Sequence, residues 1–114
     1  MSWVEDIRKF NEDRGLLDQP FGVTREYMML QDELEEFADF MQTSGERAIE
    51  AADIVVIAIG AIIKLGYDPD CIMREKLKEI ISRRGSINPE TGKWQKDPNQ
   101  KVAYKAYYRG CKVD

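Results

Sequence analysis

The sequence contains no histidine, and its only cysteines are Cys71 and Cys111. Without histidine the chain cannot form a Ser-His-Asp triad, a Cys-His dyad or a ferritin-type di-iron site, and two cysteines alone cannot make a zinc finger. Any catalysis by this chain would therefore depend on carboxylates, lysines, arginines, tyrosines or a metal bound through oxygen ligands.

The sequence also lacks a long apolar run. The longest one, residues 54–63, is too short to cross a bilayer. The N-terminus has no basic region followed by an apolar stretch, so neither a signal peptide nor a membrane contact is predicted. These absences favour a cytoplasmic location, where Cys71 and Cys111 are expected to be reduced thiols.

The 114 residues are 43% apolar and 33% charged, as expected for one soluble globular domain. The charge is unevenly distributed, because residues 1–73 carry 16 acidic and 6 basic side chains whereas residues 74–114 carry 5 acidic and 11 basic ones. This polarity suits a site that holds a cation and a polyanion together. Alternatively, the two halves simply neutralise each other across their surfaces.

The spacing of apolar residues predicts four helices joined by short loops. Capping and stop signals place these helices at about Ser2–Gly15, Thr24–Met41, Glu46–Leu65 and Pro69–Gly85. The expected fold is an all-α four-helix bundle over residues 1–99. An aromatic and basic tail, residues 100–114, is expected to pack on this domain or on a partner subunit.

Two pairs of acids lie on neighbouring predicted helices, Glu33 with Glu36 and Glu50 with Asp53. Residues three apart share one face of a helix, and both pairs lie beside apolar positions. Four carboxylates that converge without a lysine or arginine resist ionising, and a divalent cation removes that penalty. Oxygen ligands favour magnesium, manganese or calcium. The alternative is a solvated acidic surface.

The segments that carry these acids read D-E-L-E-E over residues 32–36 and E-A-A-D over residues 50–53. They resemble the E-E-x-x-E and E-x-x-D motifs of the MazG-like, all-alpha nucleoside triphosphate pyrophosphohydrolases, which include phosphoribosyl-ATP pyrophosphohydrolase, dimeric dUTPase and dCTP pyrophosphatase. Residues 74–99 are similar to a segment of small bacterial and phage proteins of the phosphoribosyl-ATP pyrophosphohydrolase-like type. The resemblance covers roughly residues 3–99.

This resemblance implies hydrolysis of a nucleoside triphosphate between the α- and β-phosphates, giving the monophosphate and pyrophosphate. Glu33, Glu36, Glu50 and Asp53 would bind Mg²⁺, for which Mn²⁺ could substitute. Glu36 is the first candidate for the proton acceptor, and Glu33 is the other catalytic candidate. Members of the superfamily are commonly dimers or tetramers, so a homodimer or homotetramer is expected.

Further candidates for substrate contacts follow from the same resemblance. Charge-assisted hydrogen bonds to the outer phosphates would come from Lys78, Arg83 and Lys93, although Lys78 and Lys93 could instead be solvated surface lysines. Candidates for the base pocket, from the first helix and the loop after it, are Asn11, Gln19 and Phe21.

One position departs from the family pattern, because Ile80 occupies the place of an asparagine. Isoleucine cannot replace an amide, so either this substrate contact is lost or Lys78 or Ser82 supplies it. The departure leaves open a second function, that of a non-catalytic nucleotide-binding sensor or adaptor.

The C-terminal tail, residues 100–114, suggests a third function, nucleic-acid binding. Its tyrosines and basic residues could grip single-stranded nucleic acid by stacking and charge, although such a tail more often packs on its own protein.

Overall fold

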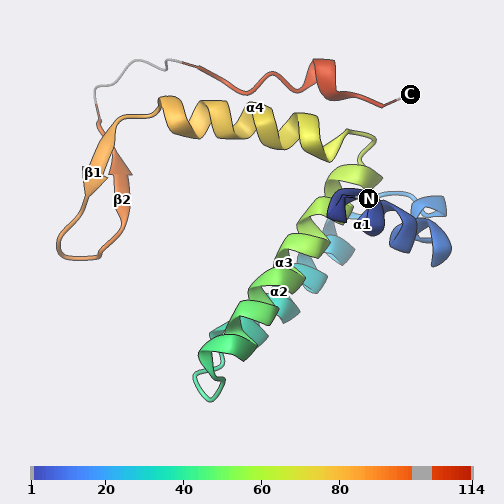
Figure 1. Cartoon of the computed structure of the whole chain (residues 1–114), viewed down its shortest axis with the longest axis horizontal. Coiled ribbons are helices and arrows are strands. Elements are labelled where there is room, and N and C mark those ends of the chain that lie inside the picture. Colours follow the sequence, from blue (N-terminus) through green and yellow to red (C-terminus); the bar gives the residue numbers. More distant parts are fainter. Residues whose placement is uncertain (1, 99–103, 114) are drawn as a thin grey trace. The chain divides into compact units, whose positions relative to one another are not determined.

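The computed structural model of the chain describes residues 2–98 and 104–113. The chain divides into two compact units, one formed by residues 1–69 with 113–114 and the other by residues 70–112. The described part is mostly helical and contains four α-helices and a two-stranded sheet (Figure 1). The predicted helical character is therefore confirmed, and the small sheet is an addition to it. None of the described helices has the length and apolar character needed to cross a membrane.

The first unit is built around a helical hairpin. It contains α1 (Trp3–Asp13), the short 3-10 helix η1 (Leu16–Asp18), α2 (Val23–Ala38) and α3 (Ser44–Lys64). Helices α2 and α3 run side by side in opposite directions, and α1 lies against the C-terminal half of α3 (Figure 1). Ile7 of α1 packs with Ile59 and Ile63 of α3 to form the core.

Local capping explains where α1 and α3 begin. The Ser2 hydroxyl accepts a hydrogen bond from the backbone N–H of Glu5 at 3.2 Å, as the sequence predicts. Helix α3 begins at Ser44, slightly earlier than predicted, because Thr43 and Glu46 form a reciprocal capping box. Gly66 follows α3 with φ 90°, which confirms its predicted role as a stop.

Helix α2 differs from its prediction at both ends. It begins at Val23 after Gly22, so Thr24 lies inside the first turn rather than at the cap. It ends at Ala38 because the Arg47 guanidinium donates to the backbone carbonyls of Phe37 and Asp39. These contacts satisfy carbonyls that a longer helix would have used internally.

The second unit combines α4 (Pro69–Ser82) with a β-hairpin and the C-terminal segment, which includes the 3-10 helix η2 (Arg109–Cys111). Strands β1 (Gly85–Ile87) and β2 (Trp94–Lys96) pair antiparallel, with Gly85 opposite Lys96. A Cβ atom at Gly85 would lie 2.0 Å from the Gln95 carbonyl oxygen, so this position requires glycine. Alternation of apolar and polar residues could not predict these strands, because each has only three residues.

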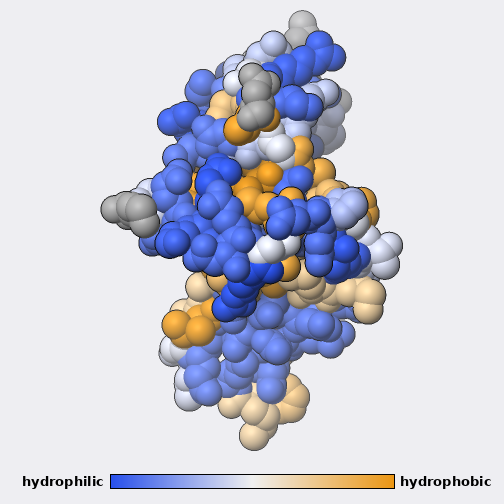
Figure 2. Space-filling model, turned by 90° about the vertical axis from the view of Figure 1, so that its right-hand side faces the viewer, coloured by the Kyte–Doolittle hydropathy of each residue, from blue (hydrophilic) through white to orange (hydrophobic). Residues whose placement is uncertain are grey.

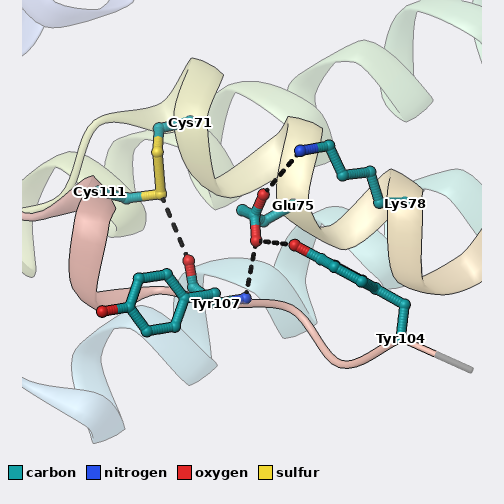
Figure 3. Close-up of a disulfide and its surroundings, with 6 residues drawn as sticks. All are labelled: Cys71, Glu75, Lys78, Tyr104, Tyr107 and Cys111. Carbon is teal, nitrogen blue, oxygen red and sulfur yellow. Dashed lines mark hydrogen bonds and ion pairs between the residues drawn. A yellow bond between two sulfur atoms is a disulfide. The ribbon is translucent and has the colours of Figure 1, made fainter. Parts of the chain in front are cut away.

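A disulfide joins Cys71 of α4 to Cys111 of η2 (Figure 3). The prediction of two reduced thiols is therefore wrong. The two cysteines are 40 residues apart in sequence, but the return of the chain along α4 brings their Cα atoms to 5.3 Å, a usual disulfide separation. Disulfides are rare in the cytosol, so this bond does not favour the predicted cytoplasmic location.

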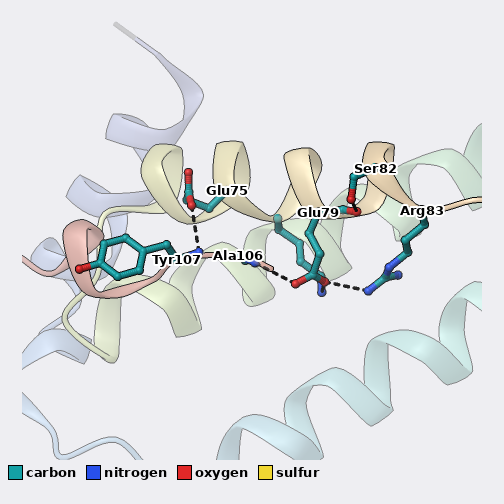
Figure 4. A network of polar contacts seen from close by, with 7 residues as sticks. Glu75, Glu79, Ser82, Arg83, Ala106 and Tyr107 are labelled. Atoms are coloured by element: carbon teal, nitrogen blue, oxygen red, sulfur yellow. Dashed lines mark hydrogen bonds and ion pairs between the residues drawn. The ribbon is translucent and has the colours of Figure 1, made fainter. Parts of the chain in front are cut away.

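Two carboxylates of α4 bind the returning segment beyond the disulfide. Glu75 accepts hydrogen bonds from the Tyr104 hydroxyl and the Tyr107 N–H, and Glu79 accepts one from the Ala106 N–H (Figures 3 and 4). Each carboxyl has a pKa lowered to about 2. The largest cause is the hydrogen bond from Tyr104 for Glu75 and the hydrogen bond from Lys76 for Glu79. These contacts therefore stabilise the unit at neutral pH and weaken as the pH falls below 4.5.

Candidate metal centre

The four acids predicted from sequence as metal ligands come together between α2 and α3. Glu33 and Glu36 lie on α2, and Glu50 and Asp53 lie on α3. One carboxylate oxygen from each residue can be chosen so that all four lie within 4.8 Å of one another. The antiparallel arrangement of the helices thus places the two pairs opposite each other.

The cluster has both half-buried and exposed members. Glu33 and Glu50 are half-buried, whereas Glu36 and Asp53 are exposed. Among the described residues, no hydrogen-bond partner reaches Glu33 Oε2 or Glu50 Oε2, although both atoms are buried. A buried carboxylate oxygen without a partner is costly, so these two atoms require a ligand, a proton or a water molecule.

Burial and neighbouring carboxylates raise the pKa of two of the acids, Glu33 and Glu50. Burial, followed by the charges of Glu36 and Asp53, raises the pKa of Glu33. A hydrogen bond with Glu36, followed by burial, raises the pKa of Glu50 to about 7. Without a cation, the site therefore retains a proton at pH values where an ordinary glutamate is ionised.

The donor set fits a hard divalent cation. Oxygen ligands on opposite sides of Mg²⁺ lie about 4.2 Å apart, and those of Ca²⁺ lie about 4.6–5.2 Å apart. The 4.8 Å limit on the carboxylate oxygens is compatible with either ion. Such an ion would offset the desolvation of Glu33 Oε2 and Glu50 Oε2, the two buried oxygens that lack a partner within residues 2–98 and 104–113.

We expect the pH to control metal affinity through Glu50. Its raised pKa means that the metal-free folded state keeps a proton that the unfolded state releases, so metal-free stability falls as the pH rises from 4.5 to about 7. Since the cation must displace that proton, the stabilisation given by Mg²⁺ should grow over the same interval. Melting temperatures with EDTA and with MgCl₂, at about pH 6 and about pH 8, measure this effect. A Mg²⁺ stabilisation independent of pH would contradict it.

The phosphate-binding candidates lie in the second unit, whereas the four acids lie in the first. On α4, Lys78 Nζ lies 3.1 Å from Glu75, and Arg83 Nη2 lies 2.7 Å from Glu79. Lys93 lies in the exposed turn of the β-hairpin. The charges of Lys78 and Arg83 are thus paired within the second unit.

Ile80 belongs to an apolar stripe of α4. It lies seven residues after Met73 and three after Leu77, and these three side chains are between 41% and 46% exposed. The Ser82 hydroxyl, which the sequence offered as a replacement for an amide, donates to the Glu79 carbonyl oxygen. The isoleucine thus continues an apolar face of the helix.

The base-pocket candidates have different environments. Asn11 is buried, its Nδ2 donates to the Ile7 carbonyl oxygen at 2.8 Å, and its amide lies against Gly60 of α3. Gln19 is exposed and Phe21 is half-buried, and both lie in the segment before α2. Asn11 therefore contributes to the packing of α1 on α3.

A buried ion pair between α2 and α3 has no counterpart among the sequence predictions. Lys64 Nζ lies 2.6 Å from Glu26 Oε1, and both side chains are buried. A helical wheel contains the signal that could have revealed it, because Glu26 shares a face with Glu33, and Lys64 shares one with Asp53.

Comparisons of the chain with protein-family models, with curated proteins and with solved structures found no match.

Proposed function

We propose that the chain is a Mg²⁺-dependent nucleoside triphosphate pyrophosphohydrolase. The observation that carries the proposal is the convergence of Glu33, Glu36, Glu50 and Asp53, among which two buried carboxylate oxygens have no partner in the described part of the chain. The similarity of residues 32–36 and 50–53 to the MazG-like motifs supports the choice of substrate class. Mn²⁺ is an expected substitute because it takes the same oxygen ligands.

In this proposal the four acids would hold the cation, and the held cation would orient the triphosphate. A bound Mg²⁺ would supply charge neutralisation and a lower pKa for the attacking water. Glu36 accepts the proton of that water, and its exposure suits an exchange with solvent. The water oxygen bonds to the α-phosphorus, and the bond from that phosphorus to the bridging oxygen breaks. The products are a nucleoside monophosphate and pyrophosphate.

A pyrophosphate-release screen tests the proposed reaction. We expect release from at least one nucleotide in a panel of canonical, deoxy and modified triphosphates with Mg²⁺ or Mn²⁺, and loss of release with EDTA. Analysis of the nucleotide product distinguishes cleavage after the α-phosphate from loss of the γ-phosphate. A folded protein that turns over no member of the panel would contradict the proposal.

A second candidate is a non-catalytic nucleotide sensor or adaptor. It is favoured by Ile80, which extends an apolar stripe, and by the pairing of Lys78 and Arg83 with Glu75 and Glu79. These features leave fewer free polar groups for a triphosphate. Nucleotide binding detected by calorimetry without any product would decide for this candidate.

We also propose that the first unit associates with a second copy of the chain. Several large apolar side chains of α2 and α3 are exposed, and hydrophobic patches are visible on the surface (Figure 2). The most exposed large apolar side chains within the two helices are Val23 at 73%, Ile49 at 65% and Tyr27 at 62%. Large apolar side chains exposed in this way are commonly covered in protein interfaces.

Light scattering tests the association. We expect a homodimer or homotetramer for the unmodified chain and a shift toward monomer for Tyr27→Glu, because a charge on this face opposes its burial. Glu35→Lys, on the polar side of the same helix, is the matched control and should leave the assembly unchanged. A monomeric unmodified chain would refute the association.

A further inference from the structure

The Glu26–Lys64 ion pair links the first turn of α2 to the last residue of α3. The Nζ–Oε1 distance is 2.6 Å, and the lysine and glutamate side chains are only 7% and 5% exposed. Glu26 Oε2 is buried and accepts no hydrogen bond from the described residues. The carboxylate is therefore desolvated, and only one of its oxygens is compensated.

Such a pair is a poor source of stability. Removing two charges from water costs several kcal/mol per ion, and buried ion pairs can often be replaced by apolar residues with no loss or with a gain of about 1–4 kcal/mol. The uncompensated oxygen of Glu26 adds to that cost. The best-attested use of such a pair other than stability is control of helix register or orientation.

The positions of the two residues connect them to the metal-binding acids. Glu26 precedes Glu33 by seven residues, which returns to the same face of α2 within about 20° and advances by about 10.5 Å. Lys64 follows Asp53 by eleven residues, which returns to the same face of α3 within about 20°. When Glu26 points at Lys64, Glu33 is thus directed toward α3 and Asp53 toward α2.

An opposing tendency comes from the apolar residues of α2. Tyr27 and Leu34 directly follow Glu26 and Glu33, so their side chains point about 100° away. They are 62% and 52% exposed, whereas the acids face α3. Within the single chain, burying Tyr27 and Leu34 on α3 would require a rotation of α2 that turns Glu26 and Glu33 away from α3, and the ion pair opposes that rotation.

We propose that Glu26 and Lys64 are positioning residues that hold α2 in the rotation required by the metal site. The short connection between the helices and the Arg47 contacts hold one end of the hairpin, and the ion pair holds the other. The four acids lie between these two sets of contacts. The inference rests on the proposed function in that the cluster is taken as a divalent-cation site.

The test replaces the pair by apolar residues of similar volume, Glu26→Leu with Lys64→Met. This double change leaves the net charge unaltered. We expect an equal or higher melting temperature together with a loss of Mn²⁺ affinity of about 10-fold, the lower end of the effect of removing groups that hydrogen-bond to metal ligands. A purely structural role would instead lower the melting temperature and leave the metal affinity of the folded protein intact.

A second variant restores the pair in reverse, Glu26→Lys with Lys64→Glu, and should recover Mn²⁺ affinity if orientation is the cause. It also covers the case in which the apolar variant does not fold. Wild-type affinity in the folded apolar variant, or no recovery in a folded reversed variant, would overturn the inference.

A distance measurement separates this inference from the proposed function. Nitroxide labels at Glu35→Cys on α2 and Ala58→Cys on α3, both exposed positions, report helix rotation without any metal. The inter-label distance should shift in the apolar variant and return in the reversed one. If the unmodified chain binds no Mn²⁺, the proposed metal site fails, and this distance alone decides the positioning role. An unshifted distance would refute it.

Discussion

Glu50→Gln is expected to abolish pyrophosphate release while making the metal-free protein more stable at neutral and higher pH. The substitution keeps the shape of the side chain and removes a ligand charge, so activity should fall by about 100-fold or more, because even groups around metal ligands cost 10- to 100-fold when mutated. The gain in stability follows from the raised pKa of about 7, which shows that the fold disfavours the ionised form of Glu50. A loss of activity together with a gain in metal-free stability is expected for a metal ligand, whereas substitution of a packing residue would lower both.

Glu35→Gln is the matched control for this experiment, since Glu35 is an exposed acid of α2 outside the cluster. It removes the same charge and should change neither activity nor metal-free stability appreciably. Pyrophosphate release is measured with saturating Mg²⁺, and melting temperatures are measured in EDTA. An active Glu50→Gln enzyme, or equal effects of the two substitutions, would contradict the assignment of Glu50 as a ligand.

Loss of the Cys71–Cys111 disulfide is expected to destabilise the second unit strongly. The bond closes a ring whose ends are 40 residues apart, and the chain-entropy relation assigns about 4 kcal/mol to a loop of this size. In Cys71→Ser with Cys111→Ser, the Glu75 and Glu79 contacts remain available, so the C-terminal segment should still bind α4 at neutral pH but unfold at lower denaturant concentration. Urea unfolding followed by the fluorescence of Trp94, which lies in this unit, measures the difference.

Dithiothreitol provides the control for the cysteine substitutions. Reduced wild type and the double serine variant should have the same unfolding midpoint, and the reductant should not affect the variant. An unfolding midpoint that neither reduction nor substitution lowers would show that the disulfide contributes nothing to the stability of this unit.

The helices of the first unit were largely predictable because their signals are local. Ser2, Thr43 and Gly66 act within one turn of their own helix, and the apolar spacing of α3 shows directly which residues can be buried. The early end of α2 was not predictable in this way. It depends on Arg47, which lies beyond the end of α2 and reaches back to carbonyls eight and ten residues earlier.

The clustering of the four acids was also predictable, since spacing alone places Glu33 with Glu36 and Glu50 with Asp53. Their convergence across two helices follows from the antiparallel hairpin. The disulfide and the contacts of Glu75 and Glu79 were missed because they join segments about 30 to 40 residues apart, for which the sequence contains no periodic signal. The Glu26–Lys64 pair was missed because charged residues are usually exposed.

The covalent ring closed by Cys71 and Cys111 has a consequence for limited proteolysis. The turn of the β-hairpin, residues 89–93, is exposed and offers an accessible cleavage site within the ring. A single cut there leaves both fragments joined through sulfur, so the nicked chain should migrate as one species on a non-reducing gel and as two after reduction. A single peptide-bond cleavage therefore opens the ring formed by the second unit but releases neither fragment of the chain.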